Sequence, residues 1–277
     1  MKIKILGCGG SFGSPLAWNR NGKINIDNQY NFRTRSSLLI NCQNTNILID
    51  TSPDLRQQLY SAKCTNVDAV LFTHIHSDHT SGLPDMRAIS LINEKIIPAY
   101  MPLNMKEQIL SHYKYIFKGH KNYRPFMEIH DIQEKFFVND VKIETFKHNH
   151  GSIDVQTYKI GKFAYSTDIK KFYKKDIDKL KNLDLWVVGL LKNEPHPSHA
   201  GFDQIMDYVK YINPKKTIMF DDIAKNLVPA SKKGFTTVWI DVGHENFSDD
   251  VASSKKYLDH QTKDLSNWLS NFNMRSI

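Results

Sequence analysis

The chain has 277 residues, a net charge of +8 and three scattered cysteines, Cys8, Cys42 and Cys64, with no CxxC pair. This cysteine usage argues against a disulfide framework or a cysteine-built zinc site, and it predicts a cytoplasmic protein. No apolar run reaches about 18 residues, so neither a membrane span nor a membrane partner is expected, while the basic balance admits nucleic acid or another anionic partner.

The predicted secondary structure begins with strands. Residues 2–6 alternate like a strand, and 36–40 and 46–50 flank a polar turn like the two arms of a hairpin. A helix is expected to begin at Ser52, in "SPDLRQQLYSA". The near-continuous apolar run at 67–73 is typical of a buried strand.

Helices and strands then alternate, which predicts a mixed α/β chain without an internal repeat. The further strands are expected at 97–101, 136–149, 155–160, 162–167, 183–191, 217–220 and 236–240. The further helices are expected at 104–117, 200–212, near 224–233 and near 255–271. We interpret the lysine-rich segment 170–181 as a solvated helix face, with a polyanion-binding face as the alternative.

Four residues of metal-ligand type directly follow the buried strand, in the pattern H-x-H-x-D-H. They are His74, His76, Asp78 and His79. Imidazole nitrogens and carboxylate oxygens suit a borderline metal such as zinc, iron or manganese. No structural requirement of a strand end calls for this pattern, so it predicts a metal site.

This motif after an apolar strand resembles the metallo-β-lactamase superfamily. The segments "ILGCGGSFGSP", "ILIDTSPDLRQQL", "VDAVLFTHIHSDHTSGLPDMRAI", "FAYSTD" and "PHPSHA" resemble its cyclic phosphodiesterase branch, over about residues 1–216. The named member of that branch acts on phosphoribosyl 1,2-cyclic phosphate. The resemblance implies an α/β fold, a four-layer αββα sandwich, with two divalent metal ions in a cleft at one edge.

The resemblance also implies roles for individual residues. His74, His76 and a later histidine would bind the first metal, Asp78 and His79 the second, and Asp168 would bridge the two. The later histidine is His148 or His150; their spacing cannot choose between them, and the small residue that follows favours His150. His199 matches a family histidine near the reacting phosphate, where it could donate a proton to the leaving oxygen.

The C-terminal part departs from the family pattern. The family ends a strand in Thr-His, whose histidine is the last ligand of the second metal, but Phe220-Asp221 stands there. From 217 to 277 the chain resembles the end of a haloacid-dehalogenase-type nucleotidase, in which an acidic pair, here Asp221 and Asp222, helps to hold Mg²⁺. The nucleophilic D-x-D strand of such phosphatases is missing, so their activity is not expected.

The chain therefore resembles a gene fusion of two parts, residues 1–216 and residues 217–277, packed into the same domain. The tail is expected to supply the last β-α-β unit of the sandwich, and Asp221 is expected to replace the missing histidine as a metal ligand. The alternative is that the tail only fills the core, so that the second metal is weak or absent.

The expected function is a metal-dependent hydrolase, a phosphodiesterase that uses a metal-bridging hydroxide held by Asp78 and Asp168. Zinc or manganese is the expected metal, and a small phosphodiester the expected substrate. Nucleic acid is an option but not the favoured partner, and a homodimer is compatible with the sequence. The alternatives are a ribonuclease or a thioesterase on the same fold, or a degenerate metal-binding remnant with impaired activity.

Overall fold

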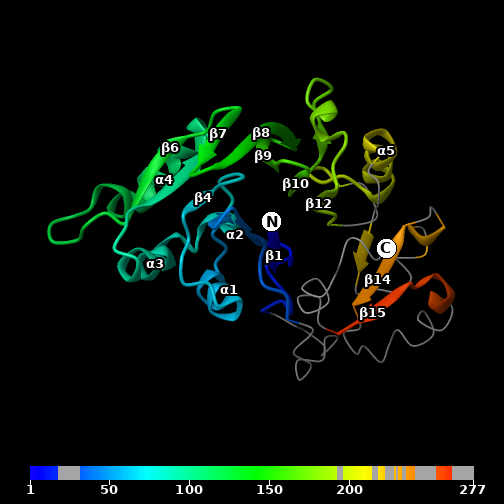
Figure 1. Cartoon of the computed structure of the whole chain (residues 1–277), viewed down its shortest axis with the longest axis horizontal. Coiled ribbons are helices and arrows are strands. Elements are labelled where there is room, and N and C mark those ends of the chain that lie inside the picture. Colours follow the sequence, from blue (N-terminus) through cyan, green and yellow to red (C-terminus); the bar gives the residue numbers. More distant parts are fainter. Residues whose placement is uncertain are drawn as a thin grey trace.

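The computed structural model describes residues 1–17, 32–191, 196–213, 218–221, 228, 230–232, 235–240 and 254–263. Its strands form two large sheets and one small sheet (Figure 1). None of the helices within these ranges combines the length and the apolar character needed to cross a membrane.

The first sheet has six strands in the spatial order β1-β2-β3-β4-β5-β6. The first three strands pair antiparallel as a meander, whereas β3, β4, β5 and β6 run parallel. The strands are β1 (Lys2–Gly7), β2 (Ser37–Cys42), β3 (Thr45–Ile49), β4 (Ala69–Leu71), β5 (Ile97–Met101) and β6 (Met127–Asp131).

The second sheet also has six strands, in the order β11-β8-β9-β10-β12 with β7 paired to β8. Its long antiparallel pair, β8 and β9, ends close to the metal-ligand motif. The strands are β7 (Lys135–Val138), β8 (Val141–His150), β9 (Ile153–Ile160), β10 (Phe163–Ser166), β11 (Lys171–Phe172) and β12 (Leu185–Val188).

Helices cover the outer face of each sheet. α1 (Leu55–Ala62), α3 (Met86–Ile92) and α4 (Leu103–Lys118) pack on the first sheet, and α5 (Phe202–Ile212) packs on the second. The short α2 (Ser77–Thr80) carries part of the motif. Single 3-10 turns lie at Leu83–Asp85, Ile177–Leu180 and Lys255–Tyr257.

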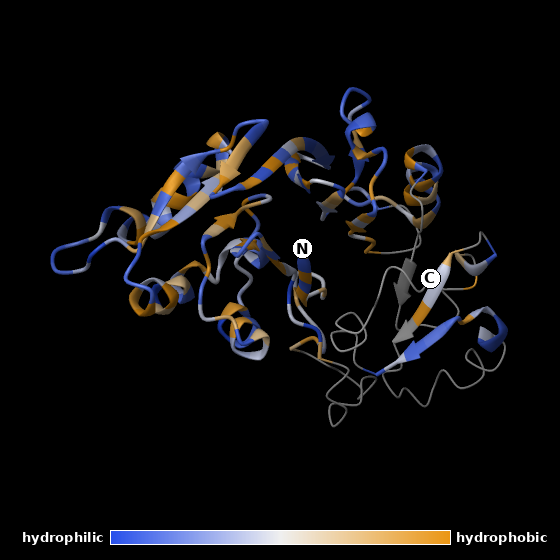
Figure 2. Ribbon diagram, viewed as in Figure 1, coloured by the Kyte–Doolittle hydropathy of each residue, from blue (hydrophilic) through white to orange (hydrophobic). Residues whose placement is uncertain are grey.

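Three apolar clusters show that the layers are stacked as helix, sheet, sheet and helix. The first cluster lies between the first sheet and its helices and includes the fully buried Phe72. The second lies between the two sheets and includes Leu38 and Tyr158. The third lies between the second sheet and α5 and includes Phe202. Figure 2 shows these apolar residues along the strands and on the packed helices, and the predicted four-layer αββα fold is confirmed.

The tail differs from the expected completion of the sandwich. Its strands β13 (Ile218–Asp221), β14 (Thr236–Ile240) and β15 (His260–Thr262) pair parallel with one another as a third sheet. Within the described residues, none of them pairs with β12. The tail nevertheless contacts the sandwich, because Ala230 is fully buried in the third cluster. The proposed division at residue 216 stays a prediction.

One predicted helix is wrong, and the described part of a second is not α-helical. Segment 170–181 contains the edge strand β11 and a 3-10 turn, because Phe172 is buried against Phe146, Trp186 and Tyr208 and its strand pairs with β8. Within 255–271, residues 260–262 form β15, because they pair with β14, and residues 264–277 lie outside the described part. Helix α3 and strand β6 were not predicted; both are short, with no strong sequence periodicity.

Candidate metal centre

The motif loop follows β4 and is held by Asp50 at the end of β3. These two strands are parallel, so their carboxyl ends lie at the same edge of the sheet. The Thr73 backbone N–H donates to Asp50 Oδ1 at 2.8 Å, and the Thr73 hydroxyl donates to Asp50 Oδ2 at 2.7 Å. Asp50 is fully buried, and burial raises its pKa. These bonds fix the start of the loop that carries the histidines.

The second sheet binds the same loop from the other side. The Gln156 backbone N–H donates to the Thr73 carbonyl at 3.0 Å, and the Tyr158 hydroxyl donates to the Phe72 carbonyl at 2.6 Å. The motif is therefore fixed between the two sheets, at the edge where side chains from both can converge.

Three histidines form a group whose ligand nitrogens all lie within 4.8 Å of one another: His74, His76 and His150. The ring centroids of His74 and His76 are 4.5 Å apart, and those of His76 and His150 are 5.2 Å apart. His150 comes from the end of β8, 74 positions beyond His76 in the chain. The fold thus brings together residues that the sequence separates.

Hydrogen bonds fix which nitrogen each buried ring turns toward the group. The single hydroxyl proton of Thr73 goes to Asp50, so the His74 Nδ1–H donates to Thr73 Oγ1 at 3.0 Å. The His150 Nδ1–H donates to the Ser198 carbonyl at 2.8 Å. Both rings then present an Nε2 lone pair, which is the form that binds a metal.

An unpaired atom shows that this group fits a cation. His74 Nε2 is buried and has no hydrogen-bond partner among the described residues. Buried polar atoms are rarely left without a partner in native proteins. Burial, helped by the neighbouring His79, holds the pKa of His74 well below its usual value, so the ring stays neutral and able to coordinate. The donors present therefore suit a divalent metal ion.

A second group contains His74, His79 and Asp168, again with ligand atoms within 4.8 Å of one another. Asp168 follows β10 with a left-handed φ of 50°. Its Oδ2 lies 2.9 Å from His79 Nε2 and 3.8 Å from His74 Nε2. Asp78 Oδ2 lies 3.4 Å from the same His79 nitrogen. Asp168 therefore lies beside His79 and faces His74, the histidine that the two groups share.

His79 is enclosed by carboxylates on both sides of its ring. Its Nδ1 lies 2.7 Å from Asp50 Oδ2, opposite the nitrogen that faces Asp168. Burial alone would lower the pKa of His79, but Asp50, Asp168 and Asp78 together outweigh it and raise the pKa well above its usual value. For Asp168, an acid, burial has the opposite effect and would raise the pKa. Its hydrogen bond to His79 and the surrounding imidazoles outweigh burial and lower the pKa of Asp168. The excess negative charge again favours a bound cation.

His199 adjoins this centre from the loop before α5. Its Nδ1 lies 3.8 Å from Asp168 Oδ1, and its ring centroid is 4.7 Å from that of His150. A third group of ligand atoms within 4.8 Å of one another consists of His150, Asp168 and His199. Burial lowers the pKa of His199. The predicted proton donor is thus placed directly beside the predicted metal ligands.

His148, the alternative to His150, lies outside these groups. Its ring is fully buried and belongs to a hydrogen-bond chain behind the site. The Trp186 indole can only donate, here to Ser166 Oγ at 3.1 Å, and Ser166 Oγ lies 2.9 Å from Thr157 Oγ1. The Thr157 hydroxyl then donates to His148 Nδ1 at 2.9 Å, and the His148 Nε2–H donates to the Thr167 carbonyl at 2.8 Å. A donor-only group at one end and a carbonyl at the other fix every proton in this chain.

The remaining predicted ligand, Asp221, is the last residue of β13. Its side chain lies outside the described part of the structure, so its proposed role stays a prediction. Sequence reasoning missed Asp50 and the chain from Trp186 to Thr167. The only signal for Asp50 was a carboxylate at the end of an apolar strand, in "ILID".

Known proteins share this fold. The model of the beta-lactamase superfamily domain matches residues 45–220. An octanoyltransferase of Porphyromonas gingivalis is 34% identical over 225 residues, which are 79% of this chain and 45% of that protein. A ribonuclease Z of Clostridium kluyveri is 28% identical over 187 residues, 66% of this chain and 54% of that protein. The chain spans about half the length of the curated relatives it matches.

Solved structures extend the comparison. A diphosphatase of the PhnP family superposes with a TM-score of 0.66 and 25% identity, over 78% of this chain and 84% of that chain. The short form of human tRNase Z superposes with a TM-score of 0.59 over 79% of this chain and 91% of that chain; at 15% identity it shows the fold alone. The superfamily model covers more than half of the sequence, and the chain therefore belongs to the beta-lactamase superfamily, with the metallo-β-lactamase fold and with His and Asp groups that could hold a metal ion.

Proposed function

We propose that this chain is a metal-dependent phosphodiesterase that acts on a small phosphodiester. One observation carries the proposal: the triple-histidine group of His74, His76 and His150 lies beside Asp168 and His199, with ligand atoms within 4.8 Å in each group. The likeness to a diphosphatase at 25% identity supports the choice of a phosphoryl compound as the substrate.

The residues present divide into ligands for two ions. The triple-histidine group would hold the first ion, Asp78 and His79 the second, and Asp168 would contact both. Mixed nitrogen and oxygen donors suit zinc or manganese. When bound, such ions would act as Lewis acids on phosphoryl oxygens and would lower the pKa of a coordinated water, to about 7 in favourable zinc sites.

The protein's own groups would orient the reactants and move the proton. Asp78 and Asp168 would accept hydrogen bonds from the attacking water and hold it in line with the phosphorus. His199 would donate a proton to the leaving oxygen. In the free protein burial lowers the pKa of His199, but a bound phosphodiester would add negative charge beside the ring, which favours the protonated form.

Leaving-group dependence tests the role of His199. A p-nitrophenolate leaving group needs little protonation, whereas an alkoxide needs it strongly. His199→Ala should therefore lower kcat/KM by about 10²- to 10⁴-fold with an alkyl phosphodiester, and by much less with bis(p-nitrophenyl) phosphate. His112→Ala, at an exposed histidine on α4, serves as the control. An equal loss with both esters would remove His199 from the proton-donor role.

A ribonuclease is the second candidate, because a curated relative is named ribonuclease Z. A thioesterase is also worth testing, since another relative is named an octanoyltransferase, although the chain spans 45% of it. A panel of a 2′,3′-cyclic nucleotide, a transfer-RNA precursor and an octanoyl thioester would separate these activities. Hydrolysis of the cyclic ester alone supports the proposal, whereas turnover of only the precursor or only the thioester contradicts it. No turnover by the metal-loaded protein would support a degenerate remnant.

A further inference from the structure

Some cationic side chains of this protein are paired with carboxylates and others are not. Seven lysines form ion pairs with nearby carboxylates: Lys95, Lys106, Lys142, Lys162, Lys179, Lys181 and Lys210. In contrast, the stretch 108–127 has no acidic residue. Its four cations, Lys114, Lys118, Lys121 and Arg124, are exposed, and none is in an ion pair with a described residue.

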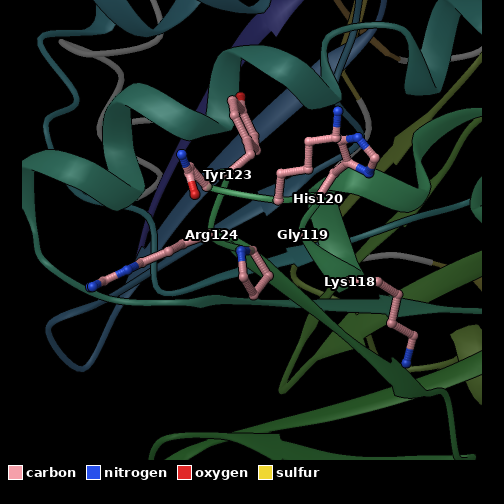
Figure 3. Close-up of a pocket in the computed structure, with 8 residues that line it drawn as sticks. Lys118, Gly119, His120, Tyr123 and Arg124 are labelled. Atoms are coloured by element: carbon pink, nitrogen blue, oxygen red, sulfur yellow. The ribbon is translucent and has the colours of Figure 1, made fainter.

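Three of these cations lie where α4 meets the loop that joins it to β6: Lys118 ends the helix, and Lys121 and Arg124 lie on the loop, residues 119–126. Residues 118–125 line a hollow of about 660 Å³ (Figure 3). Left-handed φ angles of 70° at Gly119 and 49° at Lys121 curl the backbone. The backbone N–H of His120 donates to the carbonyl of Tyr123 at 2.9 Å, and the reverse bond is 2.8 Å. The loop is thus closed on itself.

A further contact stiffens the loop from outside. The Arg87 guanidinium lies 4.5 Å from the centre of the Tyr123 ring, and that ring also meets Tyr115 edge-on at 5.6 Å. In Figure 3 the side chains of Lys118 and Arg124 extend to opposite sides of the hollow. The cations are therefore presented by a shaped loop, not by a freely moving tail.

The chemistry of the loop selects one class of partner. None of the large exposed hydrophobic side chains lies between residues 104 and 136, a stretch that is described throughout, and Figure 2 shows the loop as hydrophilic. A helix inserted into a membrane, or the core of a stable protein interface, would use apolar anchors. Unpaired cations alone fit a chain of phosphates. We propose that the α4–β6 loop binds the phosphodiester backbone of single-stranded nucleic acid.

The loop lies far from the metal centre. It precedes β6, which runs parallel to β4 and β5, whereas the metal centre follows the carboxyl ends of β3 and β4. Figure 1 shows the loop at the far left, away from α2. A five-residue strand rises about 17 Å. A small ester cannot touch both places, so this inference goes beyond the proposed function, and binding at the loop needs no metal.

The test is binding by metal-free, full-length protein. The probes are fluorescein-labelled single-stranded RNA and DNA of about 12 nucleotides, followed by fluorescence anisotropy between about 50 and 200 mM KCl. The loop variant is Lys118→Ala/Lys121→Ala/Arg124→Ala. The matched control is Lys2→Ala/Arg56→Ala/Lys63→Ala, which removes three positive charges from exposed residues elsewhere.

The expected result is unchanged binding by the control and a loss of at least about tenfold in affinity by the loop variant at low salt. The slope of log K against log salt should fall in magnitude by about 2, since each phosphate contact on a single strand contributes about 0.7. Equal losses of affinity in the loop variant and in the control would mean that the net charge of the protein, and not the loop, binds the nucleic acid. The proposal would also be overturned if the unchanged protein did not bind either oligonucleotide. Binding to phosphatidylserine vesicles in place of both nucleic acids would indicate a membrane surface.

The same variants separate this proposal from the proposed function. Hydrolysis of a small phosphodiester should be the same in the unchanged protein and in the loop variant. If no small ester is hydrolysed while the loop variant alone loses nucleic-acid binding, the proposed function fails and the docking surface stands. If hydrolysis is normal and the loop variant binds as well as the unchanged protein, only the docking surface fails.

Discussion

At the scale of single residues, Asp50 supports the metal centre through its neighbours. It accepts hydrogen bonds from His79 and from Thr73, the residue before the motif. Asp50→Asn keeps the shape but removes the charge that favours the His79 Nδ1–H. We expect metal affinity to fall by about 10- to 100-fold, measured by competition with a chromophoric chelator. The control Asp184→Asn, an exposed carboxylate paired with Lys162, should leave affinity unchanged; an unchanged Asp50→Asn protein would contradict the prediction.

His148 predicts how stability responds to acid. Burial lowers its pKa to about 4, whereas an unfolded histidine titrates near about 6.5. Between these two pH values the His148 ring binds a proton in the unfolded chain but not in the folded chain. The contribution of His148 to the free energy of unfolding is therefore fully present above about pH 6.5 and is lost as the pH falls toward 4. The loss from this residue amounts to about 3 kcal/mol.

The test is urea unfolding of metal-free protein at pH 5 and pH 7.5. His148→Gln cannot take up this proton, so its free energy of unfolding should change less between the two pH values than that of the unchanged protein. The exposed His112→Gln should keep the full change. If His148→Gln and the unchanged protein respond identically, the buried ring is not the acid-sensitive group.

At the scale of elements, α2 and the residues that follow it pack closely against the loop after β3. The Gly82 N–H donates to the Thr51 carbonyl at 3.0 Å, and the Thr51 N–H donates to the His79 carbonyl at 2.8 Å. A Cβ at Gly82 would lie 2.0 Å from the Ser52 carbonyl oxygen. Gly82→Ala should therefore cost at least about 1–3 kcal/mol of unfolding free energy and shift the motif. Gly10→Ala, whose Cβ would meet Leu191 at 3.8 Å and no other described residue, should be near neutral by urea unfolding; similar midpoints for both would contradict the clash.

The elements also show what the sequence can reveal. H-x-H-x-D-H is local, so the first half of the centre is visible in six letters. His150, Asp168 and His199 lie far along the chain, and only the family resemblance pointed to them. The wrong helix at 170–181 followed from lysine content, whereas tertiary packing of Phe172 decides that segment. The only sequence signal for Asp50, a carboxylate at a strand end, is weak, because such a residue is usually a turn residue.

At the scale of the whole molecule, the bound metal should stabilise the fold. The triple-histidine group joins the motif loop of the first sheet to β8 of the second, so an ion there links the two halves of the sandwich. A ligand at 100 times its Kd adds about 2.7 kcal/mol. Removal by a chelator should therefore lower the Tm, and added zinc should restore it. His150→Ala should abolish the rise, whereas His112→Ala should keep it; a zinc-dependent rise in His150→Ala would place the ion elsewhere.

The last prediction concerns whether the tail contributes a ligand to the second metal. The strands of the tail form a separate sheet, whereas the family resemblance implies a final strand that ends in such a ligand. Asp78, His79 and Asp168 already offer two carboxylates and one imidazole. If Asp221 adds a fourth donor, purified protein should contain two metal ions per chain and Asp221→Ala one, as measured by inductively coupled plasma mass spectrometry. Asp222→Ala, at the adjacent acidic residue, is the matched control and should keep two. Two ions in all three proteins would mean that the sandwich holds both metals without the tail, and one ion in all three would mean that the tail did not rebuild the second site.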